Sequence, residues 1–218
     1  MYYLNKIVWA MGARGRAWML AEKNLYLAMS WAALACLCGC SVFTSAPEPN
    51  VLTAEEEARG WNLLWDGDSP TNGWAGVSAG CSNFTARGWS VTNGALVASA
   101  GADPIRTTSP YKDFDLKVDY RLTPGAAGRI LYFHNAETNV DTSVAYALTP
   151  LPPEAKDPLA WQTARVVARR KHVTHWLDGR IVDRKVRGDE NLDGRIVLEP
   201  GDGQIEFRNL KIRPFGKW

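Results

Sequence analysis

Three phrases near the C-terminus decide the fold of this chain: THWLDG at 174–179, GRIVLE at 194–199 and IEFRNLKI at 205–212. Each has the pattern of a β-strand or of a hairpin. In the first phrase, Asp178-Gly179 supplies the positive φ angles that a tight two-residue turn requires. Residues 176–182 are therefore predicted to form a hairpin.

The last phrase contains a change of parity. Ile205 and Phe207 share one parity, whereas Leu210 and Ile212 share the other. Because side chains alternate between the two faces of a strand, these four residues can face one core only if an extra residue is inserted. The pattern predicts a β-bulge near residues 208–209.

The same signals recur upstream. Residues 114–122 alternate apolar and polar side chains over nine positions, which is typical of a strand with one face on a core. Residues 89–97 form a predicted hairpin around Asn93-Gly94. A short turn at 54–59 is the only helical segment that the pattern favours. Many short strands separated by turns predict an all-β protein, an antiparallel sandwich or barrel.

The N-terminus predicts export. Residues 25–37 form an almost uninterrupted apolar run after several basic residues, which is too short to span a membrane comfortably and typical of a secretory signal. The run ends in LCGC at 37–40, which resembles a bacterial lipoprotein signal with cleavage before Cys40 and lipid on its sulfur. An ordinary secretory signal or an uncleaved anchor are the alternatives. We expect a location in the bacterial cell envelope, anchored to a membrane by lipid.

Three regions follow from this interpretation: a signal peptide at 1–39, a flexible lipid-anchored linker at 40–58, and one domain at 59–218. Removal of the signal leaves 21 lysines and arginines against 22 acids, so no basic stripe suggests a nucleic-acid partner. After lipidation Cys81 is the only remaining thiol, and an internal disulfide is therefore excluded.

Several further phrases recur in a fixed order before the three closing ones. They are WNLLWDG at 61–67, GW at 73–74, GWSV at 88–91, GAL at 94–96, DFDL at 113–116, and Trp161, Arg165 and Val166. With this order the domain resembles the 3-keto-disaccharide hydrolase family, which implies a concanavalin A-like lectin/glucanase jelly roll. The resemblance implies action on glycosides whose sugar is oxidised at carbon 3. Such cleavage needs a base near C2, an acid near the glycosidic oxygen and a group that holds the enolate.

The chain departs from the family pattern in three places. Where the family has Asn-Ser-Gly, this chain has Ala-Ala-Gly at 126–128. The Glu-x-Gln-x-x-Asp strand corresponds to 143–149, which contains no acid or amide. In the segment that matches Leu-Gln-Asp-His-Gly, Gly201 occupies the histidine position. Many of the polar side chains that the resemblance implies on the concave sheet face are therefore missing or replaced by other residues.

The remaining polar residues supply the candidates for a site. The candidate catalytic residues are His134 as a base, Glu199 as an acid or sugar-binding group, and Arg165 as a group that steadies an enolate. The candidate substrate-binding residues are Tyr132 and Tyr146 on neighbouring strands and Trp74 in a predicted loop, where its ring would stack on a sugar. For each charged residue the alternative is a solvated position on a strand or a surface ion pair.

No cofactor is indicated, and no metal site. His172 and His175 are three apart on a predicted strand and so face opposite sides of the sheet, which argues against a shared metal. His175 is expected to pack within its hairpin. The expected partner is a carbohydrate, and two functions remain open for the protein. It is a hydrolase of 3-keto-disaccharides or related oxidised sugars, or a non-catalytic carbohydrate-binding domain displayed by a lipid anchor.

Overall fold

The computed structural model describes residues 48–69, 71–77, 84–135, 142–152, 154–189 and 192–216. The predicted signal, the lipidation site Cys40 and the single thiol of Cys81 lie outside these residues. Within the described ranges, no helix is long and apolar enough to cross a membrane.

The described segments contain one short helix and thirteen strands. They are α2 (Ala54–Ala58), β1 (Asn62–Leu63), β2 (Trp74–Gly76), β3 (Trp89–Thr92), β4 (Ala95–Ala98), β5 (Ile105–Thr107), β6 (Phe114–Leu122), β7 (Gly128–His134), β8 (Val144–Leu148), β9 (Gln162–Arg169), β10 (His172–Leu177), β11 (Arg180–Val186), β12 (Arg195–Pro200) and β13 (Ile205–Pro214).

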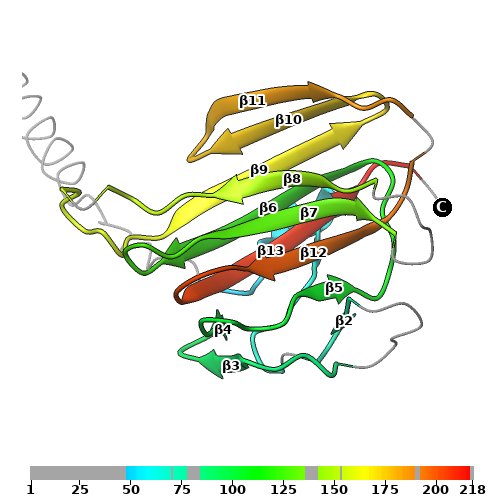
Figure 1. Ribbon diagram of the computed structural model, residues 1–218. Coiled ribbons are helices and arrows are strands. Elements are labelled where there is room, and N and C mark those ends of the chain that lie inside the picture. The colour runs from blue at the N-terminus through cyan, green and yellow to red at the C-terminus, as the bar shows by residue number, and fades with distance from the viewer. Residues whose placement is uncertain are drawn as a thin grey trace, which may run out of the picture. The chain divides into compact units, whose positions relative to one another are not determined.

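The strands form two antiparallel sheets that face each other (Figure 1). The eight-stranded sheet has the order β11-β10-β9-β6-β13-β4-β3, with β1 paired to β13. The five-stranded sheet has the order β2-β5-β12-β7-β8. At one end of the sandwich, β10 and β11 extend past the edge strand β8 of the smaller sheet, as Figure 1 shows. The prediction of an all-β antiparallel sandwich is confirmed.

The core lies between the two sheets and follows the alternation that the sequence predicts. In β6 the inward residues Phe114, Leu116, Val118, Tyr120 and Leu122 are all buried. Burial of one such side chain contributes about 1.5–3 kcal/mol. The apolar parity of the strands therefore holds the two sheets face to face.

The predicted turns and the bulge are confirmed. Asn93 and Asp178, the first residues of the two predicted hairpin turns, have φ angles of 51° and 48°. The register of β13 against β6 shifts between Arg208 and Lys211, and Asn209 has a φ angle of 51°. The extra residue returns the apolar side chains of β13 to the core.

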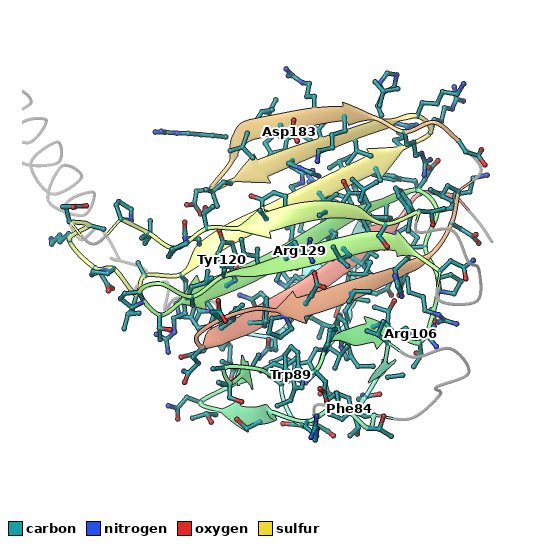
Figure 2. The ribbon with its side chains drawn as sticks, viewed as in Figure 1. Phe84, Trp89, Arg106, Tyr120, Arg129 and Asp183 are labelled. Atoms are coloured by element: carbon teal, nitrogen blue, oxygen red, sulfur yellow. The ribbon has the colours of Figure 1, made fainter. Side chains whose placement is uncertain are left out.

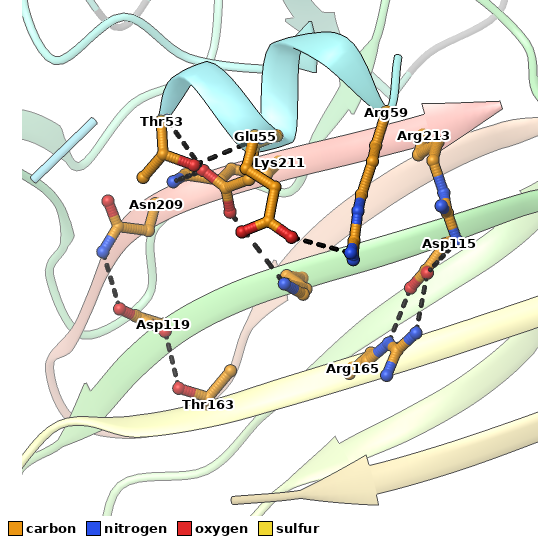
Figure 3. A network of polar contacts seen from close by, with 12 residues as sticks. Thr53, Glu55, Arg59, Asp115, Asp119, Thr163, Arg165, Asn209, Lys211 and Arg213 are labelled. Atoms are coloured by element: carbon orange, nitrogen blue, oxygen red, sulfur yellow. Dashed lines mark hydrogen bonds and ion pairs between the residues drawn. The ribbon is translucent and has the colours of Figure 1, made fainter. Parts of the chain in front are cut away.

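The segment before β1 lies on the outer face of the eight-stranded sheet (Figure 3). The backbone N–H of Asn50 donates to the side-chain oxygen of Asn209 at 2.7 Å, and the N–H of Asn209 donates to that of Asn50 at 2.8 Å. Glu56 in α2 pairs with Lys211 at 2.6 Å. Thr53 caps α2 through a reciprocal capping box with Glu56. Residues 50–58, which the sequence assigns to the linker, are thus held on β13.

Candidate functional site

The five-stranded sheet holds two of the predicted catalytic residues, Glu199 and His134. Glu199 on β12 lies opposite Arg129 on β7, and the two side chains form an ion pair of 2.6 Å. Figure 2 labels Arg129 on the outer face of this sheet. A neighbouring row of the same face contains Val197, Leu131 and Ala145. Glu199 is the only acidic residue in the five strands of this sheet, so these strands provide no pair of acids for catalysis.

His134 lies at the far end of the same sheet. Its cross-strand partner is Arg195, four residues before Glu199 on β12, which corresponds to about 13 Å along the strand. The Nδ1 atom of His134 lies 3.1 Å from the hydroxyl of Ser143. The structure therefore places His134 and Glu199 on one sheet without bringing them into contact.

Arg165 lies on the other sheet. Its guanidinium donates two hydrogen bonds to the fully buried carboxylate of Asp115, at 2.7 and 2.8 Å, and lies 5.1 Å from the ring centroid of Trp176 (Figure 3 shows the pair with Asp115). The hydrogen bond to Asp115 raises the pKa of Arg165. The side chain of Arg165 points away from the core on the eight-stranded sheet, whereas His134 and Glu199 lie on the five-stranded sheet. The structure therefore does not bring Arg165 together with His134 or Glu199.

The predicted loop position of Trp74 is wrong. Trp74 begins strand β2, its side chain is 1 % exposed, and its indole N–H donates to the carbonyl of Leu64 at 2.8 Å. The ring packs in the core and is not presented for stacking on a sugar. Trp74 belongs to the core because β2 pairs with β5, which makes it part of the five-stranded sheet. This pairing joins segments about thirty residues apart, so the local sequence does not indicate it.

The structure brings the two predicted tyrosines together around a histidine. Tyr132 and Tyr146 both point inward and are buried in the core, and are not presented to a substrate on the concave sheet face. The hydroxyl of Tyr132 lies 2.8 Å from Nε2 of His175 on β10. The ring of Tyr146 lies 4.8 Å from that of His175, and its hydroxyl donates to the carbonyl of Trp176 at 3.0 Å.

A cavity of about 300 Å³ opens beside this group, between β8 and the β10–β11 hairpin. Its lining consists of Ala145, Tyr146, Ala147, Thr149, His175, Leu177, Val182, Asp183 and Lys185. We call this cavity the edge slot, because β8 and β11 are the edge strands of the two sheets. Figure 2 labels Asp183 on β11.

Three polar side chains converge in the edge slot. A carboxylate oxygen of Asp183 lies 3.6 Å from Nδ1 of His175 and 3.5 Å from the ammonium of Lys185. Lys185 also reaches the carbonyl of Ala145 on β8, at 3.5 Å. Asp183 and Lys185 remain 45 % and 42 % exposed, so a ligand in the slot can contact both.

Burial controls the charge in the slot. Burial, together with the nearby Lys185, lowers the pKa of His175 from 6.5 to about 4, although Asp183 opposes the shift. Burial likewise raises the pKa of Tyr132 and of Tyr146 above the ordinary value of 10. Near neutral pH, the slot is therefore lined by the neutral imidazole of His175 and the protonated phenol of Tyr146, and the buried phenol of Tyr132 next to His175 is also protonated. When Tyr132 donates to Nε2, the single ring proton of His175 lies on Nδ1 and points toward Asp183.

Sequence reasoning missed His175, Asp183 and Lys185 as members of one site. The prediction that His172 and His175 face opposite sides is confirmed, since His172 is exposed and His175 is 4 % exposed. A usable signal was present: His175 shares the parity of Val173 and Leu177, so the imidazole had to point toward the core. Among the described residues, no group of three or more His, Cys, Asp or Glu side chains is placed to hold a metal ion.

The two antiparallel sheets form a β-sandwich with a polar slot between their edge strands. Residues 60–213 match the sequence profile of the 3-keto-alpha-glucoside-1,2-lyase-like domain family, and the chain belongs to this family. The predicted family is thereby confirmed.

Solved structures share the fold. A candidate glycosyl hydrolase from Parabacteroides distasonis superposes with a TM-score of 0.64 at 21% identity, over 78% of this chain and 100% of that chain. Weaker likenesses are to a laminarinase catalytic domain from Thermotoga maritima (TM-score 0.49, 14% identity, 72% and 99% covered) and to a carbohydrate-binding module from Bacillus subtilis (0.45, 17%, 65% and 96%). No curated protein matches the sequence.

Proposed function

We propose that this protein cleaves 3-keto-disaccharides or related oxidised glycosides in the edge slot. The observation that carries the proposal is a carboxylate that lies 3.6 Å from a neutral imidazole and 3.5 Å from an ammonium in one cavity of about 300 Å³. A carboxylate can act as a base and an ammonium can stabilise a developing oxyanion, which are two of the groups that this reaction needs.

The roles follow from the chemistry of a 3-keto sugar. The carboxylate of Asp183 takes the proton from C2, and the electron pair becomes the enolate of the C3 ketone, which the ammonium of Lys185 holds. The enolate then expels the leaving group from C1 with its bonding pair, and the leaving oxygen takes the proton that Asp183 removed from C2. Water then adds to the resulting C1–C2 double bond, with its oxygen bound to C1 and a proton returned to C2. His175 positions Asp183 through its Nδ1 atom.

The test is turnover of a 3-keto-disaccharide by residues 47–218, which form one compact unit. The unoxidised parent disaccharide serves as the substrate control. Asp183→Asn removes the base and should lower kcat about 10²–10⁴-fold. Arg184→Gln is the matched control, because Arg184 is adjacent in sequence but lies opposite Thr174 on the other face of the hairpin.

The outcome separates the candidate sites. Turnover that survives Asp183→Asn would show that the slot is not the catalytic site. Turnover lost in His134→Ala but retained in Asp183→Asn would place the chemistry on the outer face of the five-stranded sheet, where the sequence predicts it.

A second function is favoured by a different observation: a non-catalytic carbohydrate-binding domain. Ala145 and Ala147 occupy the strand where the family resemblance implies an acid and an amide, and Glu199 is held in an ion pair with Arg129. Calorimetry with the same sugars tests this alternative. Binding without turnover would assign the domain to carbohydrate binding, and turnover would exclude a purely binding role.

For the location, we propose that lipid on Cys40 anchors the domain to a membrane of the bacterial envelope. The support is the LCGC phrase that follows the apolar run. Mass spectrometry of the mature N-terminus would detect the lipid. Cys40→Ser should release the protein from the membrane fraction, and retention of that variant would contradict lipid anchoring.

A further inference from the structure

The outer face of the β9–β11 end of the large sheet carries arginines and exposed apolar side chains together. In the pairing of the strands, His172 lies between Arg169 and Val186, and Trp176 lies opposite Ile181. Arg184 pairs with Thr174 and so shares this face. We call the six residues Arg169, His172, Trp176, Ile181, Arg184 and Val186 the edge patch.

The apolar members of the edge patch are unusually exposed. Val186 is 72 % exposed and Ile181 is 44 % exposed, although aliphatic side chains of this size are commonly buried. Both lie on β11, whose seven residues are all exposed because the strand extends past β8 (Figure 1). Exposed aliphatic side chains on an edge strand mark a surface that a partner can cover.

The charge of the edge patch has one sign. The strand positions on this face of β9, β10 and β11 contain no aspartate or glutamate. Within the described part of the chain, neither Arg184 nor Arg169 forms an ion pair, and the guanidinium of Arg169 lies 5.6 Å from the ring centroid of Phe215. Asp183, the nearby acid on β11, faces the edge slot on the other side of the hairpin. The patch therefore favours an anionic partner.

The aromatic residues of this sheet face argue against a polysaccharide as that partner. A sugar-binding platform presents open aromatic rings, but here cations cover the rings. The guanidinium of Arg165 lies 5.1 Å from the ring centroid of Trp176, and that of Arg208 lies 4.1 Å from Trp161. Exposed aliphatic side chains next to arginines instead suit the boundary between lipid headgroups and acyl chains.

The chain enters the domain on the same face. Asn50, near the first described residue, is bound to Asn209 on β13, and only β6 separates β13 from β9. Adjacent strands are about 4.8 Å apart, so β9 lies about 10 Å from β13 across the sheet, and Arg169 lies six residues along β9 from Thr163, which is level with the bulge at Asn209. The first described residues therefore lie on the sheet face that carries the patch.

We propose that the edge patch docks the domain on an anionic lipid surface. Arg169 and Arg184 contact headgroup phosphates, and Ile181 and Val186 enter the outer acyl region. The edge slot opens on the other face of the β10–β11 hairpin and stays accessible to a sugar. This docking does not depend on the catalytic proposal.

The experiment measures binding of residues 47–218, which lack the lipid anchor, to vesicles of phosphatidylcholine alone or with about 30 mol % phosphatidylglycerol as the anionic lipid. The double variant Arg169→Gln/Arg184→Gln should bind the anionic vesicles about thirtyfold more weakly, because each arginine contributes about 1 kcal/mol near an anionic surface, or about fivefold. The matched control is Arg87→Gln/Arg129→Gln, which removes two positive charges from exposed positions elsewhere.

The expected result is binding to anionic vesicles alone, weakened by salt and by the patch variant but not by the control. Ile181→Ser/Val186→Ser should also weaken binding, without changing its salt dependence. Absence of binding to anionic vesicles, or equal loss in the control pair, would overturn the proposal. Tighter binding to dextran sulfate than to vesicles would overturn the lipid assignment in favour of an anionic polysaccharide.

Discussion

The buried imidazole of His175 should make the stability of this domain depend on pH. Its pKa is about 4 in the folded state, against an ordinary value of 6.5 that applies to the unfolded chain. Between these two pH values the unfolded state binds more protons than the folded state, so stability decreases as the pH falls. His175 stabilises the fold fully above pH 6.5, and about 3 kcal/mol of this stability is lost by pH 4.

Urea unfolding of residues 47–218 at pH values from 4 to 7 would measure this dependence. The variant His175→Gln removes the titration but keeps an amide that can bond to the hydroxyl of Tyr132. Burial raises the pKa of Glu56, but its hydrogen bonds with Lys211 and Thr53 outweigh burial, so the pKa is lowered overall. Glu56 therefore also loses stabilisation in acid. The quantity to compare is therefore the difference between the wild type and His175→Gln at each pH.

That difference should change by about 3 kcal/mol between pH 6.5 and pH 4, and should be constant above pH 6.5. His172→Gln is the matched control, because it removes an exposed imidazole from the same strand. If the wild type and His175→Gln lose stability in parallel over this range, His175 is not held neutral by burial, and the electrostatic description of the edge slot is wrong.

Two further predictions concern packing. Gly194→Ala should destabilise the fold by about 1–3 kcal/mol in a thermal unfolding assay, because the added Cβ would lie 2.3 Å from the backbone of Phe133. Gly188→Ala is the control and should be neutral in the same assay, because its Cβ would meet open space. Asn50→Ala removes the acceptor of the Asn209 N–H and the donor to the Gly94 carbonyl, and should cost about 2 kcal/mol. Faster proteolysis before α2 would report the loss, and unchanged cleavage would show that this pair does not hold the segment.

The strands, turns and bulge were predictable because their signals are local. The alternation in residues 114–122 reflects the two faces of β6, and the Asn93-Gly94 and Asp178-Gly179 pairs adopt the expected positive φ angles. The bulge near Asn209 followed from a change of parity within one strand. Each of these features depends on residues that are neighbours in sequence.

The edge slot was not predictable because it depends on pairing between distant segments. The register of β10 against β11 shifts between His175 and Trp176, which places Asp183 opposite His175 and Ile181 opposite Trp176. Residues 181 and 183 would share one face in a regular strand, but this irregularity puts one on the edge patch and the other in the slot. No local signal in β11 marks the shift.

The candidate residues illustrate the same division. Glu199 and His134 lie on strands that the sequence placed correctly, but their separation along β12 keeps them apart. Arg165 lies on the other sheet, because strand order is set by sheet assembly and not by position in the chain. The sequence by itself determined the class of fold, the family and the parity of β6 and β13, since these depend on local pattern. Only the tertiary structure decided which polar side chains meet, because that depends on strand order, register and the offset between two sheet edges.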